Sequence, residues 1–186
     1  MTPSDAGPRD GTVRLRRALP ADAAGVAAAH RQAWVETYTG LLPAPVVTGR
    51  GLGEFVQLWS GALKPGASWT TFVCEIPHGP IAGFASAGPI RSPTEDRKGP
   101  LDAELIALYL LEEHQGYGLG RVLFEAARAD LAERGFARMA VRVLATNTAV
   151  GFYAYMGGRT VTAEDRPYRG VTVREWSDPL GVVQFY

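Results

Sequence analysis

The sequence contains a single cysteine, Cys74, among its 186 residues. An intramolecular disulfide is therefore excluded, and a chain so poor in cysteine fits a reducing compartment, so we expect a cytoplasmic protein. Long apolar runs are also missing. No stretch approaches the length of a membrane span, and residues 1–12 lack the apolar middle of a signal peptide. We therefore expect no membrane partner.

An excess of charge of either sign is missing as well. The 19 basic and 19 acidic residues give a formal net charge of zero, which argues against a protein whose main role is to hold nucleic acid. The three histidines, His30, His78 and His114, show no metal-ligand spacing with Cys74, so we expect no metal site. The 46% apolar and 20% charged residues are the composition of an ordinary globular chain.

The order of predicted elements indicates one domain at residues 13–177, between a polar tail at 1–12 and a C-terminal tail at 178–186. Hydrophobic periodicity and turn residues predict the elements of this domain. They are a strand at 13–16, a helix opened by 19–22 and running to about Tyr38, a helix at 45–63, strands at 70–76 and 81–87, a loop at 91–100, a strand at 104–111, a helix at 119–134, a strand at 138–144, a helix at 148–156, and a last hairpin of 159–163 with 170–176. This order predicts a single mixed α/β sheet and not a strictly alternating, doubly wound fold.

The segment 104–135 combines a strand, a glycine loop and an amphipathic helix. Residues 104–111 are apolar at odd and even positions, which is typical of a strand covered on both faces. Three glycines, Gly116, Gly118 and Gly120, then precede the helix. The first N–H groups of a helix lack internal acceptors, and glycines let the backbone approach a phosphate closely. We therefore interpret residues 115–120 as a phosphate cradle.

Two familiar phosphate-binding motifs do not fit this loop. A dinucleotide-binding fingerprint needs a third glycine where the chain has Arg121 or Leu123, depending on which glycine begins the count. A Walker loop needs a lysine, and no lysine occurs between residues 99 and 186. A glycine turn that only connects the strand to the helix remains the simple alternative.

The loop reads QGYGLG and resembles the Q/R-x-x-G-x-G/A motif of the GNAT superfamily of acyl-CoA-dependent N-acyltransferases. Residues 103–110 resemble the fourth strand of that family. Residues 147–153, followed by Gly157 and Gly158, are similar to its N…FY…G segment, although Gly158 departs from the commoner Gly-Phe ending. The resemblance covers residues 13–176. It implies a mixed, mostly antiparallel central sheet flanked by helices, with a splayed strand pair that holds CoA, and at the family level a homodimer through the last strands.

The resemblance also implies which residues bind acetyl-CoA. The backbone of the fourth strand would pair with the pantetheine arm and polarise the thioester carbonyl, and the loop N–H groups would hold the pyrophosphate. Arg121 would either pair with a phosphate or be a solvated helix residue, and Asn147 would bind the CoA arm while also capping a helix. The strand and loop positions are Leu108, Tyr109, Leu110, Gln115, Gly116, Tyr117, Gly118, Leu119 and Gly120.

Acetyl transfer to an amine needs a deprotonated amine, a polarised carbonyl and a protonated or stabilised thiolate. The family resemblance points to Tyr153 as the acid at the sulfur, the alternative being a tyrosine packed in the core. Glu104 is the candidate base because it begins an otherwise apolar strand, where an unpaired buried carboxylate would be costly. The alternative for Glu104 is a solvated or ion-paired residue. Weaker candidates are Glu36, Asp102 and Glu112.

The acceptor site is expected where relatives recruit residues from the first helices, here His30, Trp34 and Tyr38, although such a stripe is more often core. Cys74 lies in a predicted strand core, which disfavours an acyl-enzyme and favours a direct ternary-complex mechanism. The predicted function is an N-acetyltransferase acting on a primary amine of a small molecule or peptide. The alternatives are a non-catalytic acyl-CoA sensor and a cradle for another phosphate-bearing ligand, such as a nucleotide.

Overall fold

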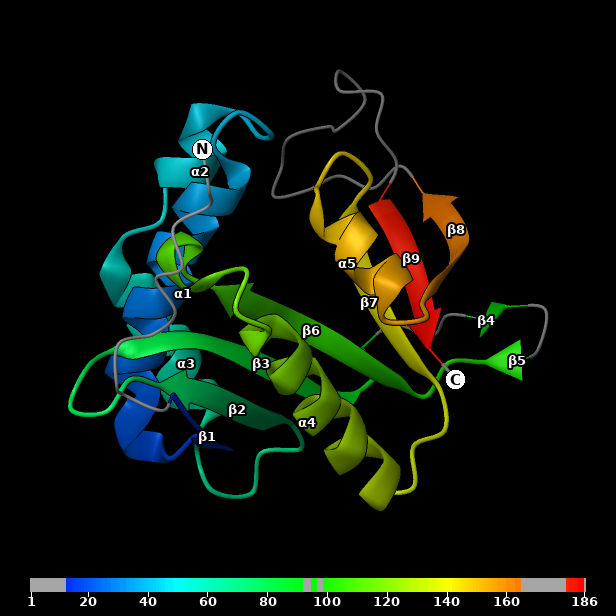
Figure 1. Ribbon diagram of the computed structural model, residues 1–186, viewed down its shortest axis with the longest axis horizontal. Coiled ribbons are helices and arrows are strands. Elements are labelled where there is room, and N and C mark those ends of the chain that lie inside the picture. Colours follow the sequence, from blue (N-terminus) through cyan, green and yellow to red (C-terminus); the bar gives the residue numbers. More distant parts are fainter. Residues whose placement is uncertain (1–12, 92–94, 97–98, 165–179, 186) are drawn as a thin grey trace, which may run out of the picture.

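The computed structural model describes residues 13–91, 95–96, 99–164 and 180–185. Its centre is a seven-stranded sheet (Figure 1). In spatial order the strands are β1 (Arg14–Arg17), β2 (Thr70–Glu75), β3 (Ile81–Pro89), β6 (Ala103–Leu110), β7 (Met139–Leu144), β9 (Leu180–Phe185) and β8 (Arg159–Glu164). β6 and β7 pair in parallel, and the other neighbours pair antiparallel. The predicted mixed, mostly antiparallel fold is confirmed.

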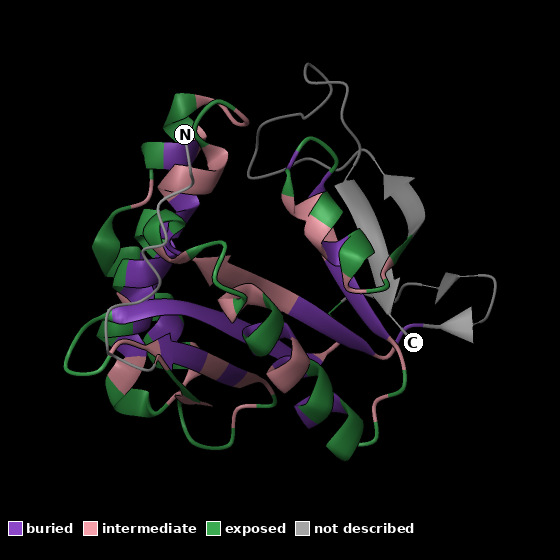
Figure 2. Cartoon of the chain, viewed as in Figure 1, coloured by how far each residue is buried: buried purple, intermediate pink, exposed green. Residues whose placement is uncertain are grey.

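Helices cover both faces of this sheet. The helical segments are η1 (Pro20–Asp22), α1 (Ala23–Tyr38), α2 (Ala44–Thr48), α3 (Leu52–Ala62), η2 (Glu112–His114), α4 (Leu119–Glu133) and α5 (Ala149–Tyr155). Side chains of α1 and α3 form one buried cluster with Val73 and Phe84, and α4 packs a second cluster around Leu105 and Val141. Figure 2 shows buried residues along the strands and on the inner sides of these helices.

Two predicted segments differ in detail from the structure. The helix predicted at 45–63 is divided into α2 and α3 by the sequence Gly49-Arg50-Gly51, because glycine is a poor helix former. The loop predicted at 91–100 contains two short paired strands, β4 (Glu95–Asp96) and β5 (Gly99–Pro100).

The chain terminus supplies a strand. The sequence predicts a tail at residues 178–186, yet Leu180–Phe185 forms β9 and pairs with β7 on one side and β8 on the other. The strand predicted at 159–163 is present as β8, but its partner is β9. The expected partner at 170–176 lies outside the described residues, as does the tail at 1–12.

The β6–β7 pair opens into a fork. The two strands are paired only between residues 103–105 and 139–141, and Figure 1 shows them diverging from that point. On the other side of β6, Ser86 faces Ala107 while Ala87 faces Leu105, so Ile106 is an extra residue in a bulge. β6 is therefore buried at residues 103–105 and only half-buried at 106–110, which corrects the expectation of a strand covered on both faces throughout.

The bulge at Ile106 also reverses which side chains face which layer. Before it, Ala103 and Leu105 belong to the α4-side cluster, and after it Ala107 and Tyr109 belong to the cluster of α1 and α3. Because side chains alternate along a strand, Glu104 projects to the α1 and α3 side. The bulge thus brings Glu104 to the same face as Ala107 and Tyr109, across the sheet from α4.

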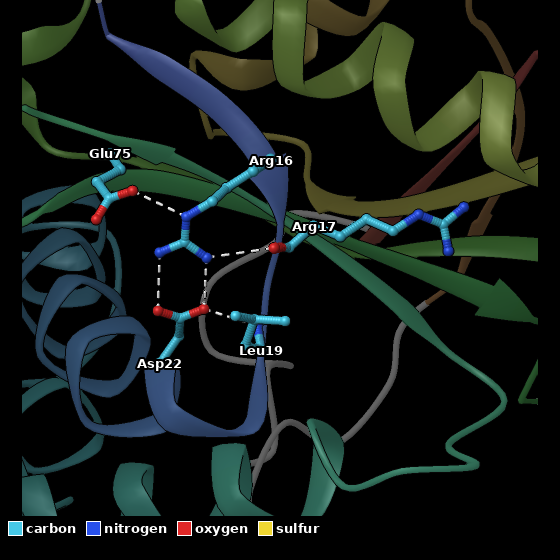
Figure 3. A network of polar contacts seen from close by, with 5 residues as sticks. All are labelled: Arg16, Arg17, Leu19, Asp22 and Glu75. Carbon is cyan, nitrogen blue, oxygen red and sulfur yellow. Dashed lines mark hydrogen bonds and ion pairs between the residues drawn. The ribbon is translucent and has the colours of Figure 1, made fainter.

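Ion pairs fasten the edge strand β1 to its surroundings (Figure 3). Arg16 Nε donates to Glu75 at 2.8 Å, and its two Nη groups donate to Asp22 at 2.7 and 2.9 Å. The Leu19 N–H also donates to Asp22, at 2.6 Å. The hydrogen bonds from Arg16 lower the pKa of the Asp22 carboxyl, and burial opposes this effect only in part. The neighbouring Arg17 points away from this group and pairs with Asp130 of α4.

We expect Asp22→Asn to reduce the free energy of unfolding at pH 7 by about 1–3 kcal/mol, the value of hydrogen bonds to a charged group. The pKa of Asp22 is lowered in the folded state, so its contribution is complete above the unfolded pKa of about 3.9 and is lost as the pH falls through the folded pKa. Urea unfolding between pH 6 and pH 3 should therefore show a smaller loss of stability in the variant than in the wild type. Equal losses would contradict the assigned role.

Candidate active site

A cleft of about 1300 Å³ opens at the β6–β7 fork, and most of the predicted site residues line it. These are His30, Trp34, Tyr38, Glu104, Leu108, Tyr109, Leu110, Gln115, Gly116, Gly118, Gly120, Arg121, Asn147 and Tyr153. Tyr117 and Leu119 belong to the same loop and helix start but do not line the cleft. The structure thus gathers residues from α1, β6, the glycine loop and α5 around one space.

The glycine loop has the geometry of an anion site. Gly116 and Gly118 have φ angles of 83° and 80°, a left-handed region that glycine enters without strain. A Cβ placed on either glycine would meet no atom within 4 Å, so open space lies in front of the loop. α4 begins directly afterwards, and its first N–H groups lack acceptors within the helix. These features fit a pyrophosphate.

The side chain of Gln115 has a structural role in this loop. Its Nε2 donates to the carbonyl oxygen of Leu110 at 3.0 Å, which ties the loop to the end of β6. The side chain of Arg121, in the first turn of α4, is exposed and lines the cleft. Gln115 therefore shapes the loop, while Arg121 extends its positive potential into the cleft.

Asn147 and Tyr153 approach the cleft from the α5 side. The Oδ1 atom of buried Asn147 accepts a hydrogen bond from the Ala149 N–H at 2.9 Å, so its side chain binds the first N–H group of α5, while Thr148 and not Asn147 occupies the N-cap position. The Tyr153 side chain is also buried. Burial raises the pKa of its phenol, and the nearby Tyr38 raises this pKa further. The Tyr153 hydroxyl is therefore protonated at physiological pH, and it is a weaker acid than a free phenol.

Glu104 is buried at the fork, with only 1% of its surface exposed. Arg91 donates to its carboxylate through Nε at 3.1 Å and Nη2 at 2.7 Å, and Arg142 donates through Nη1 at 3.2 Å. Burial raises the pKa of Glu104, but the hydrogen bonds and positive charges of these arginines outweigh it and lower the pKa below its usual range. The carboxylate is therefore ionised and has a low affinity for protons, which favours a positioning role over direct proton abstraction.

Two of the three weaker base candidates, Glu36 and Asp102, are engaged in structural contacts, while Glu112 lines the cleft. Glu36 accepts hydrogen bonds from the Glu112 N–H at 3.0 Å and from Gln32 at 2.9 Å, which joins α1 to the segment that follows β6. Asp102 accepts from two backbone N–H groups at the entry to β7, at 2.9 and 2.8 Å. Neither contact points to a role in proton transfer.

Cys74 lies in the core between the sheet and α4, with 1% of its surface exposed. Burial raises the pKa of its thiol to about 11. A protonated, enclosed thiol is a poor nucleophile, which agrees with the expectation that Cys74 carries no acyl group.

Aromatic rings form the wall of the cleft beside α1 and α3. His30 Nδ1 accepts a hydrogen bond from Trp59 Nε1 at 3.1 Å, and the His30 ring lies 4.7 Å from that of Tyr109. The Trp34 and Tyr38 rings are in contact, tilted by 47° with centres 4.2 Å apart, and the Tyr109 hydroxyl donates to that of Tyr38 at 3.4 Å. The predicted stripe on α1 is therefore core on its inner side and cleft wall on its outer side.

Sequence reasoning missed several residues of this cleft. The sequence predicts Arg91 in a loop and Arg142 in a strand and assigns Trp69 to no element, and nothing in their local patterns marks them as site residues. The signal that the sequence did contain was Glu104 itself, since a buried carboxylate requires a cationic partner.

Neither a metal site nor a membrane span is found in the described part of the chain. No group of three or more His, Cys, Asp or Glu side chains is placed there to hold a metal ion. The helices of the same residues all fall short of the length and hydropathy that crossing a bilayer requires.

Comparison with known proteins agrees with this geometry. A model of the Acetyltransferase (GNAT) family matches residues 29–157. The uncharacterized N-acetyltransferase YuaI of Bacillus subtilis is 33% identical over 170 residues, covering 89% of this chain and 94% of that protein.

Solved structures share the fold. YncA, a putative acetyltransferase from Salmonella typhimurium with its cofactor acetyl-CoA, has a TM-score of 0.68 at 19% identity, over 94% of this chain and 93% of that one. PaiA N-acetyltransferase from Thermoplasma acidophilum, in complex with coenzyme A, has a TM-score of 0.67 at 16% identity, over 93% and 98%. The chain therefore belongs to the GNAT acetyltransferase family, which confirms the predicted enzyme class of an acetyl-CoA-dependent acyltransferase.

Proposed function

We propose that this protein transfers the acetyl group of acetyl-CoA to a primary amine by direct attack within a ternary complex. The observation that carries the proposal is the β6–β7 fork, because it opens one cleft to both the glycine loop and Tyr153. The acetyl-CoA and CoA present in the solved neighbours support this choice of co-substrate.

The chain offers two groups of backbone donors to acetyl-CoA. The N–H groups of the loop at 115–120 and of the first turn of α4 hold the pyrophosphate, assisted by Arg121. β6 beyond Leu105 is no longer paired with β7, so its backbone at residues 108–110 binds the pantetheine arm and polarises the thioester carbonyl. Asn147 lines the cleft and binds the arm from the α5 side.

Tyr153 acts as the acid that protonates the departing thiolate. Its raised pKa makes the phenol a weaker acid than usual, so the transfer depends on the thiolate, whose affinity for protons also rises when burial removes its hydration. Glu104 acts on the amine through a water molecule and is not itself the proton acceptor, because its lowered pKa gives the carboxylate a low affinity for protons. The amine proton therefore passes to the solvent, and Glu104 orients the polar groups around the acceptor.

The position of Cys74 supports a direct mechanism. Its thiol is enclosed in the core and does not line the cleft, so this thiol is not available to carry the acetyl group. The amine enters from the side of α1 and α3, where His30, Trp34 and Tyr38 form the wall. Acetyl-CoA enters from the side of α4.

The experiment that tests co-substrate binding is a thermal shift assay with acetyl-CoA, CoA and ATP side by side. At 100 times its Kd, a ligand of the folded state should raise the Tm of a chain of this length by about 5–10 °C. We expect this shift with acetyl-CoA and CoA and a much smaller one with ATP. Selective stabilisation by ATP would make the loop a nucleotide site and remove the proposal.

A further inference from the structure

Glu36 ties α1 to the segment that leads into the glycine loop. Its Oε2 atom accepts a hydrogen bond from the Glu112 N–H at 3.0 Å, although the two residues are 76 positions apart in the sequence. Glu112 follows the end of β6 and opens η2, and Figure 1 shows β6 ending beside α1. Both residues line the cleft. The contact therefore joins the helix on the acceptor side to the start of the acetyl-CoA loop.

The α1 end of this contact is well supported. Ala33 and Trp34, which precede Glu36 in the helix, are buried, so α1 is held against the core at this point. The second carboxylate oxygen of Glu36, Oε1, accepts from Gln32 Nε2 at 2.9 Å, one turn earlier on the helix. Each oxygen thus has a hydrogen bond, which restricts the rotamers of the side chain before any ligand binds.

From Glu112 the hydrogen bonds lead into the glycine loop. The Glu112 carbonyl oxygen accepts from the Gln115 N–H at 3.1 Å, and the Gln115 side chain donates to the Leu110 carbonyl oxygen at 3.0 Å. Gln115 directly precedes Gly116, the first of the two loop glycines with positive φ angles. A residue that fixes the backbone at Glu112 therefore also fixes the point from which the loop starts.

A glycine loop needs such support because glycine restricts its own backbone little. Each residue that has to be ordered when a ligand binds costs conformational entropy, and contacts formed beforehand reduce this cost. The Glu36 carboxylate cannot itself attract the pyrophosphate, since both groups are negatively charged. A contribution of Glu36 to acetyl-CoA binding must then come from its hydrogen bond to the backbone, for which a neutral acceptor serves equally well.

We infer that Glu36 is a positioning residue for acetyl-CoA, which holds the backbone at Glu112 and so keeps the N–H groups of residues 115–120 arranged for the pyrophosphate. The inference rests on the proposed function, because it requires this loop to bind the pyrophosphate of acetyl-CoA. It also separates Glu36 from the catalytic base. The side chain acts through the backbone and touches neither the amine nor the thioester.

The test compares two variants of similar length and helix propensity. Glu36→Gln keeps a carbonyl oxygen that can accept from the Glu112 N–H, and the Gln32 amide can turn to accept from the new NH₂ group. Glu36→Met places a thioether there, which is only a weak acceptor. Calorimetric titration should give a Kd for acetyl-CoA within about twofold of the wild type for Glu36→Gln and about five- to tenfold higher for Glu36→Met, the value of one hydrogen bond.

Steady-state thiol release separates this role from general-base catalysis. With saturating acetyl-CoA, both variants should keep a kcat close to that of the wild type, while the KM for acetyl-CoA rises only in Glu36→Met. Loss of kcat in Glu36→Gln would show that the carboxylate takes part in proton transfer and would overturn the inference. An equal rise of the Kd in both variants would also overturn it, because the charge and not the hydrogen bond would then matter.

Glu125→Met is the matched control. Glu125 pairs with Arg128 on the exposed side of α4, and neither residue lines the cleft, so this variant loses a carboxylate from a helix without touching the loop. Its Kd for acetyl-CoA should equal that of the wild type. Amide hydrogen exchange without ligand checks the physical basis, since residues 111–118 should exchange faster in Glu36→Met than in Glu36→Gln.

The remaining outcomes separate the inference from the proposed function. Thermal transitions establish that each variant folds, and Glu36→Ala replaces Glu36→Met if the latter does not. If the folded variant without an acceptor binds acetyl-CoA as tightly as the wild type, the contact with Glu112 is only structural, and the inference fails while the proposed function stands. If the wild type does not bind acetyl-CoA, the proposed function fails and the inference fails with it.

Discussion

Replacing Tyr153 with phenylalanine should lower kcat for acetyl transfer by about 10²- to 10⁴-fold, the usual contribution of a positioned general acid. The substitution removes one hydroxyl from a buried ring and leaves its packing against Phe152 in place. The KM for acetyl-CoA should change little, because the hydroxyl acts on the leaving thiolate and not on the bound thioester. Steady-state thiol release measures both constants.

The neighbouring tyrosine provides the control for this experiment. Tyr155 stands on the same helix two residues later, with 75% of its surface exposed, so Tyr155→Phe should retain a kcat close to that of the wild type. The raised pKa of Tyr153 also predicts no loss of activity from its ionisation up to about pH 10. A Tyr153→Phe enzyme with full kcat would assign protonation of the thiolate to water or to another group.

Replacing Gly118 with valine should raise the Kd for acetyl-CoA by about 100-fold or more, equivalent to losing two hydrogen bonds to a charged group. Gly118 has a φ angle of 80° and immediately precedes α4. A β-branched residue is strained in this left-handed conformation. Its side chain would also enter the open space before the loop, where the phosphates must approach the backbone. Calorimetric titration with acetyl-CoA measures the loss.

Gly66 allows the strain to be separated from the effect on binding. It has a φ angle of 79°, also faces open space, and lies outside the cleft. Gly66→Val should therefore lower the thermal stability to a similar extent and leave the Kd for acetyl-CoA unchanged. Similar affinity losses in both variants would mean that backbone strain alone explains the result and that the loop does not hold the phosphates.

Much of the fold could be predicted from local patterns. The strand, glycine loop and helix between residues 103 and 133 appear as expected, because periodicity and glycine positions are properties of adjacent residues. β9 was not predicted, since Pro179 and Gly181 are unfavourable in an isolated strand. Its stability comes from pairing on both sides with β7 and β8, and that pairing depends on the whole sheet.

Only those site residues that belong to a sequence motif could be predicted. The motifs indicated the loop, Asn147, Tyr153 and Glu104, and the structure gathers all of them around one cleft. The partners of Glu104 could not be identified, because Arg91 and Arg142 are separated from it by 13 and 38 positions and come from different elements. The bulge at Ile106, which decides the face that Glu104 occupies, leaves no mark in the local sequence.

The central claim is that the cleft transfers an acetyl group from acetyl-CoA to an amine. Its most direct test is the release of free CoA thiol from acetyl-CoA by the purified wild-type protein, with and without amines, and with the N-acetylated product identified by mass spectrometry. We predict that thiol release depends on the amine and equals the N-acetylated product in amount. Binding of acetyl-CoA without any amine-dependent release would contradict the claim and indicate an acyl-CoA-binding member of the family.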